Sequence, residues 1–297
     1  MSVILSVHGL VKNYGNIRAV DNVSFEVSQG EVCGILGPNG SGKTTTLSVI
    51  MGAVTPRYGS FRWNLPETKG GNAALQIGTL IEAPNFYPYL SLERNLRIQA
   101  IIKKVPEADI ERVLNISGLY DRRHSRYQNL SLGMKQRLGI AAALLGDPAV
   151  LVLDEPANSL DPQGIADVRD IIRGEAEQGK TILMASHILD EVEKVCSHVV
   201  VLKKGKVIGS GSVDDLLARD DQIVVSCEKP EMLKKLLEQD KRVKKINQEN
   251  GDLLLHVDET LDSGTLNELA FQQGIILTKI IRRQRTLESQ FLELVKD

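Results

Sequence analysis

The sequence of 297 residues has few cysteines and no excess of either charge, and each shortage excludes a class of protein. Its three cysteines, Cys33, Cys196 and Cys227, lie far apart and form no C-x-x-C pair, so neither a disulfide framework nor a cysteine-based zinc site is expected. The net charge of −2 gives no general attraction to nucleic acid, and no DNA- or RNA-binding signature is present. We therefore expect no nucleic-acid partner.

Long hydrophobic runs are missing as well. No segment approaches the ~20 apolar residues that span a bilayer. The N-terminal segment MSVILSVHGL lacks the basic start and the long apolar core of a signal peptide, so we expect a cytoplasmic protein. The hydrophobic content of 42% is nonetheless ordinary for a globular chain, which predicts a folded core and argues against long disorder.

The first two thirds of the chain combine β-patterns with helices. Residues 1–30 alternate apolar and polar positions, which predicts an antiparallel β-layer. An apolar strand over 31–36 leads through a glycine-rich turn into a helix over 43–52, and residues 89–146 repeat Leu, Ile and Ala at helical spacing. Short β-rich runs then alternate with helical stretches, at 150–153, 181–185 and 199–202. This alternation predicts an α/β fold with a parallel sheet and helices packed on it.

Beyond residue 218 the pattern changes to short elements in the order β-α-β-β-α-β, followed by a helical run after Ile281. Asn250-Gly251 stands between two alternating runs and predicts a hairpin turn. The order is typical of a small ferredoxin-like domain. We therefore expect two domains, residues 1–218 and 219–297. The second is either a dimerisation or regulatory domain or a passive appendage, and the sequence leaves both possibilities open.

A phosphate-binding loop is predicted at Gly37-Pro-Asn-Gly-Ser-Gly-Lys43-Thr44, which matches G-x-x-x-x-G-K-[ST] between a strand and a helix. Glycines let successive N–H groups converge on an anion, and the helix N-terminus adds its positive dipole end. We expect Lys43 to reach the β- and γ-phosphates and the Thr44 hydroxyl to bind Mg²⁺. The predicted nucleotide-binding residues here are Gly37, Pro38, Asn39, Gly40, Ser41, Gly42, Lys43, Thr44 and Thr45.

A second apolar strand, at residues 151–153, ends in Asp154 and Glu155. A strand buried on both faces presents acids only at its C-terminal edge, where ligands bind in open α/β sheets. Asp154 is predicted to hold the Mg²⁺, and Glu155 to orient and polarise the attacking water. Two adjacent acids alone are weak evidence, but together with the upstream loop they predict ATP hydrolysis.

The segment Asn129-Leu-Ser131-Leu-Gly133-Met-Lys-Gln-Arg137 lies between these two motifs, and His187 follows in Ala-Ser-His. With these residues the chain resembles the ATP-binding-cassette (ABC) family, whose signature segment usually reads LSGGQ-x-Q-R. The resemblance covers about residues 1–210. The spacings, 88 residues from Lys43 to Ser131 and 32 from Glu155 to His187, fit a compact transporter cassette. The resemblance implies an α/β P-loop NTPase with an antiparallel β-layer and a helical subdomain.

The resemblance also implies roles for single residues. Tyr14 matches the aromatic residue that stacks on adenine, and His187 matches the histidine that bonds the γ-phosphate. Ser131 and Gly133 match the signature residues that contact the γ-phosphate bound by the other subunit, and Asp161 belongs to the loop that crosses the dimer interface. The alternatives are a plain strand aromatic for Tyr14 and a helix N-cap for Ser131, which is compatible with the signature role.

The chain departs from the family pattern at three places. Leu132 and Met134 replace the usual Gly and Gln of the signature, and Asn158-Ser159 replaces the usual small pair before Leu160. Glu82 stands where the family has a metal-contacting Gln, so it is predicted as a third metal ligand; the alternative is that it points to solvent before Pro84. The segments I-E-x-P-x-F-Y-P and S-L-G-M-K-Q-R resemble the branch that includes the bacitracin- and daunorubicin-export ATPases.

The resemblance implies an ATPase that forms a homodimer around two ATP molecules with Mg²⁺. Such a dimer drives a separate integral-membrane permease from the inner face of the cell membrane, and the branch favours export. Two alternative functions are disfavoured. A DNA-repair or translation ATPase is disfavoured because the chain holds one compact cassette, and a non-hydrolysing regulatory module is disfavoured by Lys43, Glu155 and His187. The transported substrate is not encoded in this chain.

Overall fold

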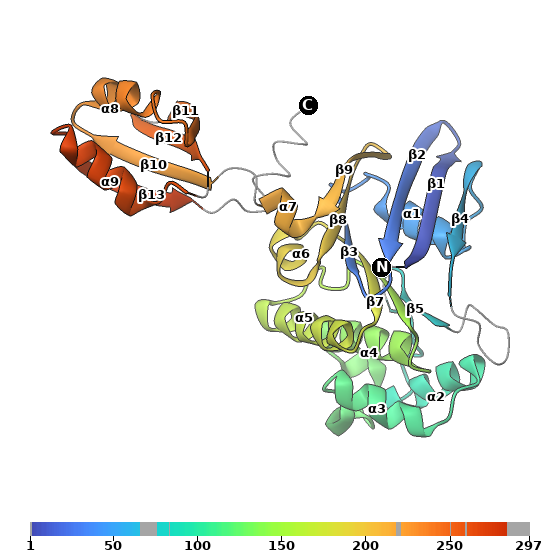
Figure 1. Ribbon diagram of the computed structural model, residues 1–297. Helices are drawn as coiled ribbons and strands as arrows, with labels where there is room; N and C mark the ends of the chain where they lie inside the picture. The colour runs from blue at the N-terminus through green and yellow to red at the C-terminus, as the bar shows by residue number, and fades with distance from the viewer. Residues whose placement is uncertain are drawn as a thin grey trace. The chain divides into compact units, whose positions relative to one another are not determined.

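The computed structural model describes residues 2–65, 76–82, 84–217, 221–249, 251–258 and 260–283. The chain divides into two compact units, Met1–Val213 and Asp214–Asp297 (Figure 1). The domain boundary expected at 218–219 lies outside the described residues. A helix was expected beyond Ile281; the described chain continues as a strand to Arg283, and the rest of that segment lies outside the described residues. In the part of the chain that is described, no helix has both the length and the apolar character that crossing a membrane requires.

A six-stranded sheet in the order β5-β6-β7-β3-β8-β9 forms the centre of the first unit. Its strands are β3 (Val32–Leu36), β5 (Ile77–Leu80), β6 (Val150–Asp154), β7 (Thr181–Ser186), β8 (His198–Lys203) and β9 (Lys206–Ser212). Every residue of β3, β6 and β7 is buried, as expected for strands covered on both faces. All neighbouring strands pair in parallel except β9, which returns antiparallel to β8 through the Lys204-Gly205 turn. The predicted α/β fold is confirmed, with one antiparallel edge strand.

A second, three-stranded sheet in the order β2-β1-β4 makes the predicted antiparallel layer. It consists of β1 (Val3–Tyr14), β2 (Ile17–Ser28) and β4 (Tyr58–Trp63). Alternate apolar residues of β2, such as Val23 and Phe25, share one buried core with Leu47 and Ile50 of α1 (Lys43–Ile50) and with β3. The shared core holds the helix that follows the phosphate loop between the two sheets.

The helical part of the first unit comprises α2 (Leu92–Lys103), α3 (Ala108–Ile116) and α4 (Leu132–Leu144). In Figure 1 these green helices gather at the end of the central sheet away from the antiparallel layer. Two short 3-10 turns, Tyr120–Arg122 and Tyr127–Asn129, lead into α4. The helices α5 (Pro162–Glu177) and α6 (Leu189–Val195) complete the unit, and α7 (Val213–Leu217) begins at its end.

The second unit is an antiparallel sheet in the order β11-β12-β10-β13 with two helices. Its elements are β10 (Asp221–Cys227), α8 (Pro230–Leu237), β11 (Val243–Glu249), β12 (Asp252–Val257), α9 (Ser263–Gln272) and β13 (Leu277–Arg283). Residues of both helices and of the strands form a core of its own, which includes Ile223, Leu233, Leu255 and Leu266. The small α+β part of the predicted fold is therefore present, whereas a ferredoxin-like domain spanning 219–297 and its role stay predictions.

Candidate nucleotide site

The loop between β3 and α1 has no room for side chains at its critical glycines. A Cβ on Gly37 would lie 2.3 Å from Ser41 Oγ and 2.4 Å from the Leu202 carbonyl oxygen. Gly42 has φ 103°, and a Cβ there would lie 2.4 Å from the Ala19 carbonyl oxygen. Only glycine tolerates this backbone without strain. The local sequence therefore fixes a tight loop at the N-terminus of α1, the arrangement that binds an anion.

Lys43, the first residue of α1, turns back over this loop. Its side chain is only 6% exposed, and its ammonium donates to the Gly37 carbonyl at 2.8 Å and to the Pro38 carbonyl at 3.5 Å. Nζ also lies 3.2 Å from Glu155 Oε1. The positive charge is thus held at the mouth of the phosphate loop, where it is available to an incoming phosphate.

Glu155 follows β6 and has a φ of 47°, which is rare for a residue with a Cβ and is typical of functional sites. Its N–H donates to the Ala185 carbonyl at the end of β7 at 2.9 Å, which stabilises this conformation. The other carboxylate oxygen, Oε2, lies 2.7 Å from Nδ1 of His187, a residue that is 40% exposed. Lys43, Glu155 and His187 come from three elements and form one continuous chain of contacts.

Asp154 is the last residue of β6 and is 4% exposed. Burial raises its pKa, a hydrogen bond with Thr44 opposes this change, and the charges of Glu155 and Glu82 raise the pKa further. Its Oδ1 is buried without a hydrogen-bond partner among the described residues. A buried carboxylate oxygen with a free lone pair, next to a hydroxyl, is a suitable environment for a hard cation and its water ligands. Asp154 and Thr44 therefore fit Mg²⁺.

Glu82 lies after the C-terminal end of β5 and is exposed, with a φ of 63°. Its charge reaches Asp154, since it contributes to the raised pKa of that residue. This position is at the same carboxyl edge of the sheet as Asp154, because β5 and β6 are parallel neighbours. Metal binding by Glu82 stays a prediction.

A cavity of about 440 Å³ opens over the phosphate loop. The loop residues Asn39 to Thr45 and Glu155 line it, together with residues that were not predicted as part of the site: Ile17, Arg18, Ala19, Asn158 and Lys204. Gly205 explains part of this convergence. Its N–H donates to the Ser41 carbonyl at 2.9 Å and its carbonyl accepts from the Asp21 N–H at 2.8 Å, so the β8–β9 turn and β2 meet at the loop. The Lys204-Gly205 pair is typical of a hairpin turn but does not predict that this turn contacts the phosphate loop.

Tyr14 lies at the end of β1, opposite Ile17 of β2, and its side chain is 49% exposed. Lys12 Nζ lies 5.3 Å from the centroid of its ring. Ile17 lines the cavity, so Tyr14 is the strand partner of a cavity residue. Stacking of Tyr14 on adenine stays a prediction.

The signature residues lie on other elements. Ser131 is the exposed N-cap of α4 and accepts from the Met134 N–H at 3.3 Å, so the N-cap interpretation is what the structure shows. Asp161 is the N-cap of α5 and accepts from the Gly164 N–H at 2.8 Å. Among the described residues that line the cavity over the phosphate loop, Ser131, Gly133 and Asp161 are absent.

Comparison with known proteins adds four findings. The sequence model described as "ABC transporter" matches residues 20–158. The bacitracin transport ATP-binding protein BcrA of Bacillus licheniformis is 36% identical to this chain, and the match includes 99% of this chain and 98% of BcrA. The Nod factor export ATP-binding protein I of Cupriavidus metallidurans is 36% identical over 73% of this chain and 74% of that protein. A solved ATP-binding subunit of an ABC transporter is similar with a TM-score of 0.63 at 33% identity, over 72% of this chain and 91% of that one.

Proposed function

This chain belongs to the ABC transporter family as its ATP-binding, ATP-hydrolysing subunit, and we propose that it works as a homodimer that closes on two Mg²⁺-bound ATP molecules and drives a separate membrane permease. The observation that carries the catalytic part is the chain of contacts from Lys43 through Glu155 to His187. It joins a phosphate-binding cation, a candidate base and an imidazole at one edge of the sheet.

The residues divide the chemistry as follows. Lys43 exchanges its carbonyl and carboxylate partners for the β- and γ-phosphates, and the loop N–H groups bind the same oxygens. Glu155 orients a water molecule for in-line attack on the γ-phosphorus and accepts its proton. His187 holds Glu155 through Nδ1, which leaves Nε2 for a γ-phosphate oxygen.

Asp154 and the Thr44 hydroxyl are the groups that would hold Mg²⁺, with Glu82 as a further candidate ligand. A bound Mg²⁺ supplies positive charge that stabilises the phosphate oxygens during transfer. The charge would also remove the cost of keeping Asp154 ionised in its buried position.

The homodimer is supported by the division of the motifs within one chain. The phosphate loop and the acids surround one cavity, whereas Ser131, Gly133 and Asp161 lie at the N-termini of two other helices. Two copies related by a two-fold axis would supply both halves twice, because an isologous interface uses the same surfaces of each subunit. Closure and reopening would then be switched by γ-phosphate contacts.

Export through a permease is supported by the relatives, whose names state bacitracin transport and Nod factor export. A permease partner would place this chain at the inner face of the cell membrane. The substrate class follows from the permease and not from the residues of this chain.

The test is Glu155→Gln, which keeps the shape of the side chain and removes its basicity. We expect unchanged ATP affinity, a turnover lowered by at least about 100-fold, and an ATP-dependent dimer in size-exclusion chromatography. Glu177→Gln, an exposed position near the end of α5, is the matched control and should behave as wild type. Turnover at the wild-type rate in Glu155→Gln would refute the catalytic assignment, and a chain that stays monomeric with ATP would refute the homodimer.

A further inference from the structure

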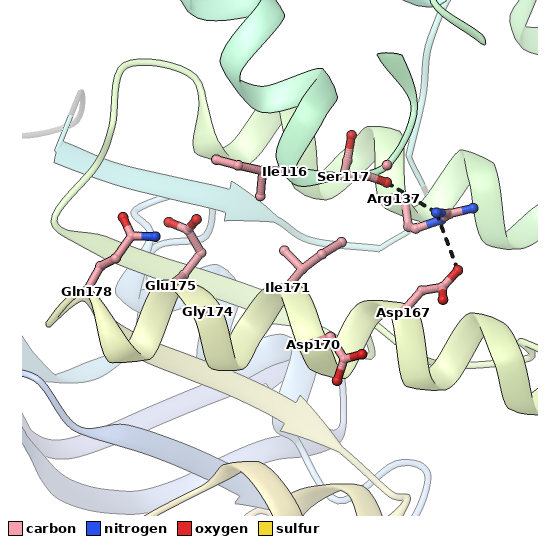
Figure 2. Close-up of a pocket in the computed structure, with 10 residues that line it drawn as sticks. Ile116, Ser117, Arg137, Asp167, Asp170, Ile171, Gly174, Glu175 and Gln178 are labelled. Atoms are coloured by element: carbon pink, nitrogen blue, oxygen red, sulfur yellow. Dashed lines mark hydrogen bonds and ion pairs between the residues drawn. The ribbon is translucent and has the colours of Figure 1, made fainter. Parts of the chain in front are cut away.

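Arg137 of α4 connects three elements of the first unit, as Figure 2 shows. Its Nη1 lies 3.3 Å from Asp167 Oδ2 on α5 and donates to the Ser117 carbonyl, directly after α3, at 3.2 Å. The side chains of Arg137 and Asp167 are 20% and 28% exposed, so the pair is largely shielded from water. Asp167 is itself held by Gln163, whose Nε2 donates to Oδ1 at 2.8 Å.

The contact lies at the border of a hollow. A cavity of about 420 Å³ separates α5 from the end of α3, and Arg137, Asp167, Ile116, Ile171 and Gly174 are among the residues that line it. Arg137 connects the sides of this hollow directly, through the contact with Asp167 on α5 and the contact with the Ser117 carbonyl after α3.

The same two helices meet again nearer their N-termini. A Cβ on Gly133 would lie 3.9 Å from Gly164 Cα and 4.0 Å from Leu160 Cδ2, so α4 and α5 approach closely at this point. Arg137 and Asp167 each lie six residues after the N-cap of their helix, which corresponds to ~9 Å along each axis. The Gly133–Gly164 contact and the Arg137–Asp167 pair therefore lie one above the other along the two helices, and together they fix the direction of α4 relative to α5.

We propose that Arg137 is a positioning residue for ATP hydrolysis, which locks α4 to α5 so that Ser131 and Asp161 meet the partner subunit as one rigid unit. The proposal rests on the proposed homodimer, in which both N-caps face the ATP bound by the other copy. Without the connection, α4 would pivot about the Gly133–Gly164 contact and the two N-caps would no longer fit one nucleotide at the same time. A displacement of about 1 Å at a reacting group can lower the rate by about 100-fold.

Three variants test this role: Arg137→Ala, Arg137→Lys and Asp167→Asn. In the Glu155→Gln background we expect Arg137→Ala to raise the ATP concentration for half-maximal dimerisation about tenfold or more, while the affinity of the monomer for ATP stays unchanged. With Glu155 intact, kcat should fall by roughly 10- to 100-fold. Arg137→Lys should restore part of both effects, because an ammonium keeps the charge but is less suited to binding both partners in a fixed geometry.

The matched control is Arg169→Ala on α5, the helix that carries Asp167. Arg169 is 22% exposed and pairs with Glu191 of α6 at 3.1 Å, away from α4. We expect it to lower the thermal midpoint about as much as Arg137→Ala does but to leave dimerisation and kcat near wild type. Equal dimerisation midpoints and kcat values for Arg137→Ala and Arg169→Ala would overturn the proposal.

Two further outcomes keep the test decisive. If Arg137→Ala does not fold, Arg137→Lys and Asp167→Asn decide, because both preserve the volume of the side chain, and wild-type behaviour in both overturns the proposal. If Glu155→Gln without a second substitution fails to dimerise with ATP, the proposed homodimer is refuted. If it dimerises, and Arg137→Ala, Arg137→Lys and Asp167→Asn in this background dimerise equally well, only the role of Arg137 is refuted.

Discussion

At the scale of single residues, the carboxyl edge of the central sheet concentrates negative charge. Asp154, Glu155 and Glu82 lie at the ends of two neighbouring parallel strands, and Glu155 has a cation beside it, Lys43 at 3.2 Å. Burial raises the pKa of Asp154 and the charges of Glu155 and Glu82 raise it further, whereas Thr44 and Lys43 lower it. A divalent cation at this edge would therefore stabilise the ionised carboxylates.

Glu82 provides the first prediction at this scale. A Glu at this position should bind Mg²⁺ more strongly than a Gln but should repel metal-free ATP, since it adds a full negative charge. We expect Glu82→Gln to retain its maximal rate and to need about fivefold more Mg²⁺ for half-maximal rate, which corresponds to about 1 kcal/mol. Glu82→Ala should lose much of the rate. The measurement is ATPase rate against Mg²⁺ concentration for the three proteins.

Binding of ATP without metal is the complementary measurement. Glu82→Gln should bind metal-free ATP more tightly than the wild type does, because the repulsion is gone. If the three Mg²⁺ titrations superimpose, Glu82 does not act at the metal and its exposed position serves only the turn before Pro84.

The sequence allowed the polar centre of this site to be predicted, because its groups belong to short motifs with fixed chemistry. Lys43, Glu155 and His187 were each assigned a role from a motif, and the structure brings them together. Arg18 and Lys204 were not found, since they reach the cavity only through the backbone contacts of Gly205 with Ser41 and Asp21. Such contacts between distant turns leave no local pattern.

At the scale of elements, α4 depends on other parts of the chain at both ends. Ser131 caps its N-terminus, and Lys103 of α2 donates to the carbonyls of Ala142, Ala143 and Leu145 at its C-terminus. These carbonyls have no partner within the helix, and a cation there also interacts favourably with the helix dipole. Burial nevertheless lowers the pKa of Lys103 to about 8, with the charge of Asp109 opposing the change.

Lys103→Met is the prediction at this scale. At pH 7 we expect the variant to be less stable by about 1–2 kcal/mol, because the buried carbonyls lose their donor. Between pH 8 and 10.5 the unfolded chain keeps the Lys103 proton while the folded chain has released it, so raising the pH favours the folded wild type. The stability advantage of the wild type over the variant should therefore grow as pH rises through this window and shrink as pH falls to 8.

Urea denaturation of both proteins between pH 7 and 10.5 measures the difference. The control is Lys104→Met, at the adjacent exposed position that caps α2. If Lys103→Met and the wild type show parallel stability profiles across this range, the carbonyl-bound ammonium does not titrate as proposed.

The elements found from the sequence are those with a strong period or a sharp boundary. The buried strands β3, β6 and β7 were predicted from continuous apolar runs, and α4 from its helical spacing. The strands β4, β5 and β9 were missed. The sequences of β4 and β9, YGSFRW and KVIGSGS, are rich in Gly and Ser, and β5, IGTL, has only four residues. They form strands because β1, β6 and β8 supply the hydrogen-bonding edge. Pairing with a distant strand outweighs weak intrinsic propensity.

At the scale of the whole molecule, the chain consists of two units that each have a hydrophobic core of their own. Every predicted catalytic residue belongs to the first unit, which therefore contains the whole candidate nucleotide site. The second unit exposes large apolar side chains, and Phe271 and Ile276 are each 73% exposed. Exposed apolar groups of this size are typical of an interaction surface when they gather on one face.

Truncation after Ala218 is the prediction that separates a functional second unit from a passive appendage. Because the first unit has its own core, residues 1–218 should fold and bind ATP with the affinity of the full chain. In the Glu155→Gln background, we expect the truncated protein to need more ATP or more protein to form the dimer, or to lose permease-coupled transport when it is assembled with its membrane partner. The measurements are ATP binding, size exclusion across protein concentrations, and transport by the complete transporter. If the truncated chain matches the full chain in dimer stability and in coupled transport, the second unit is a passive appendage. If the truncated chain does not bind ATP, the two units do not fold independently.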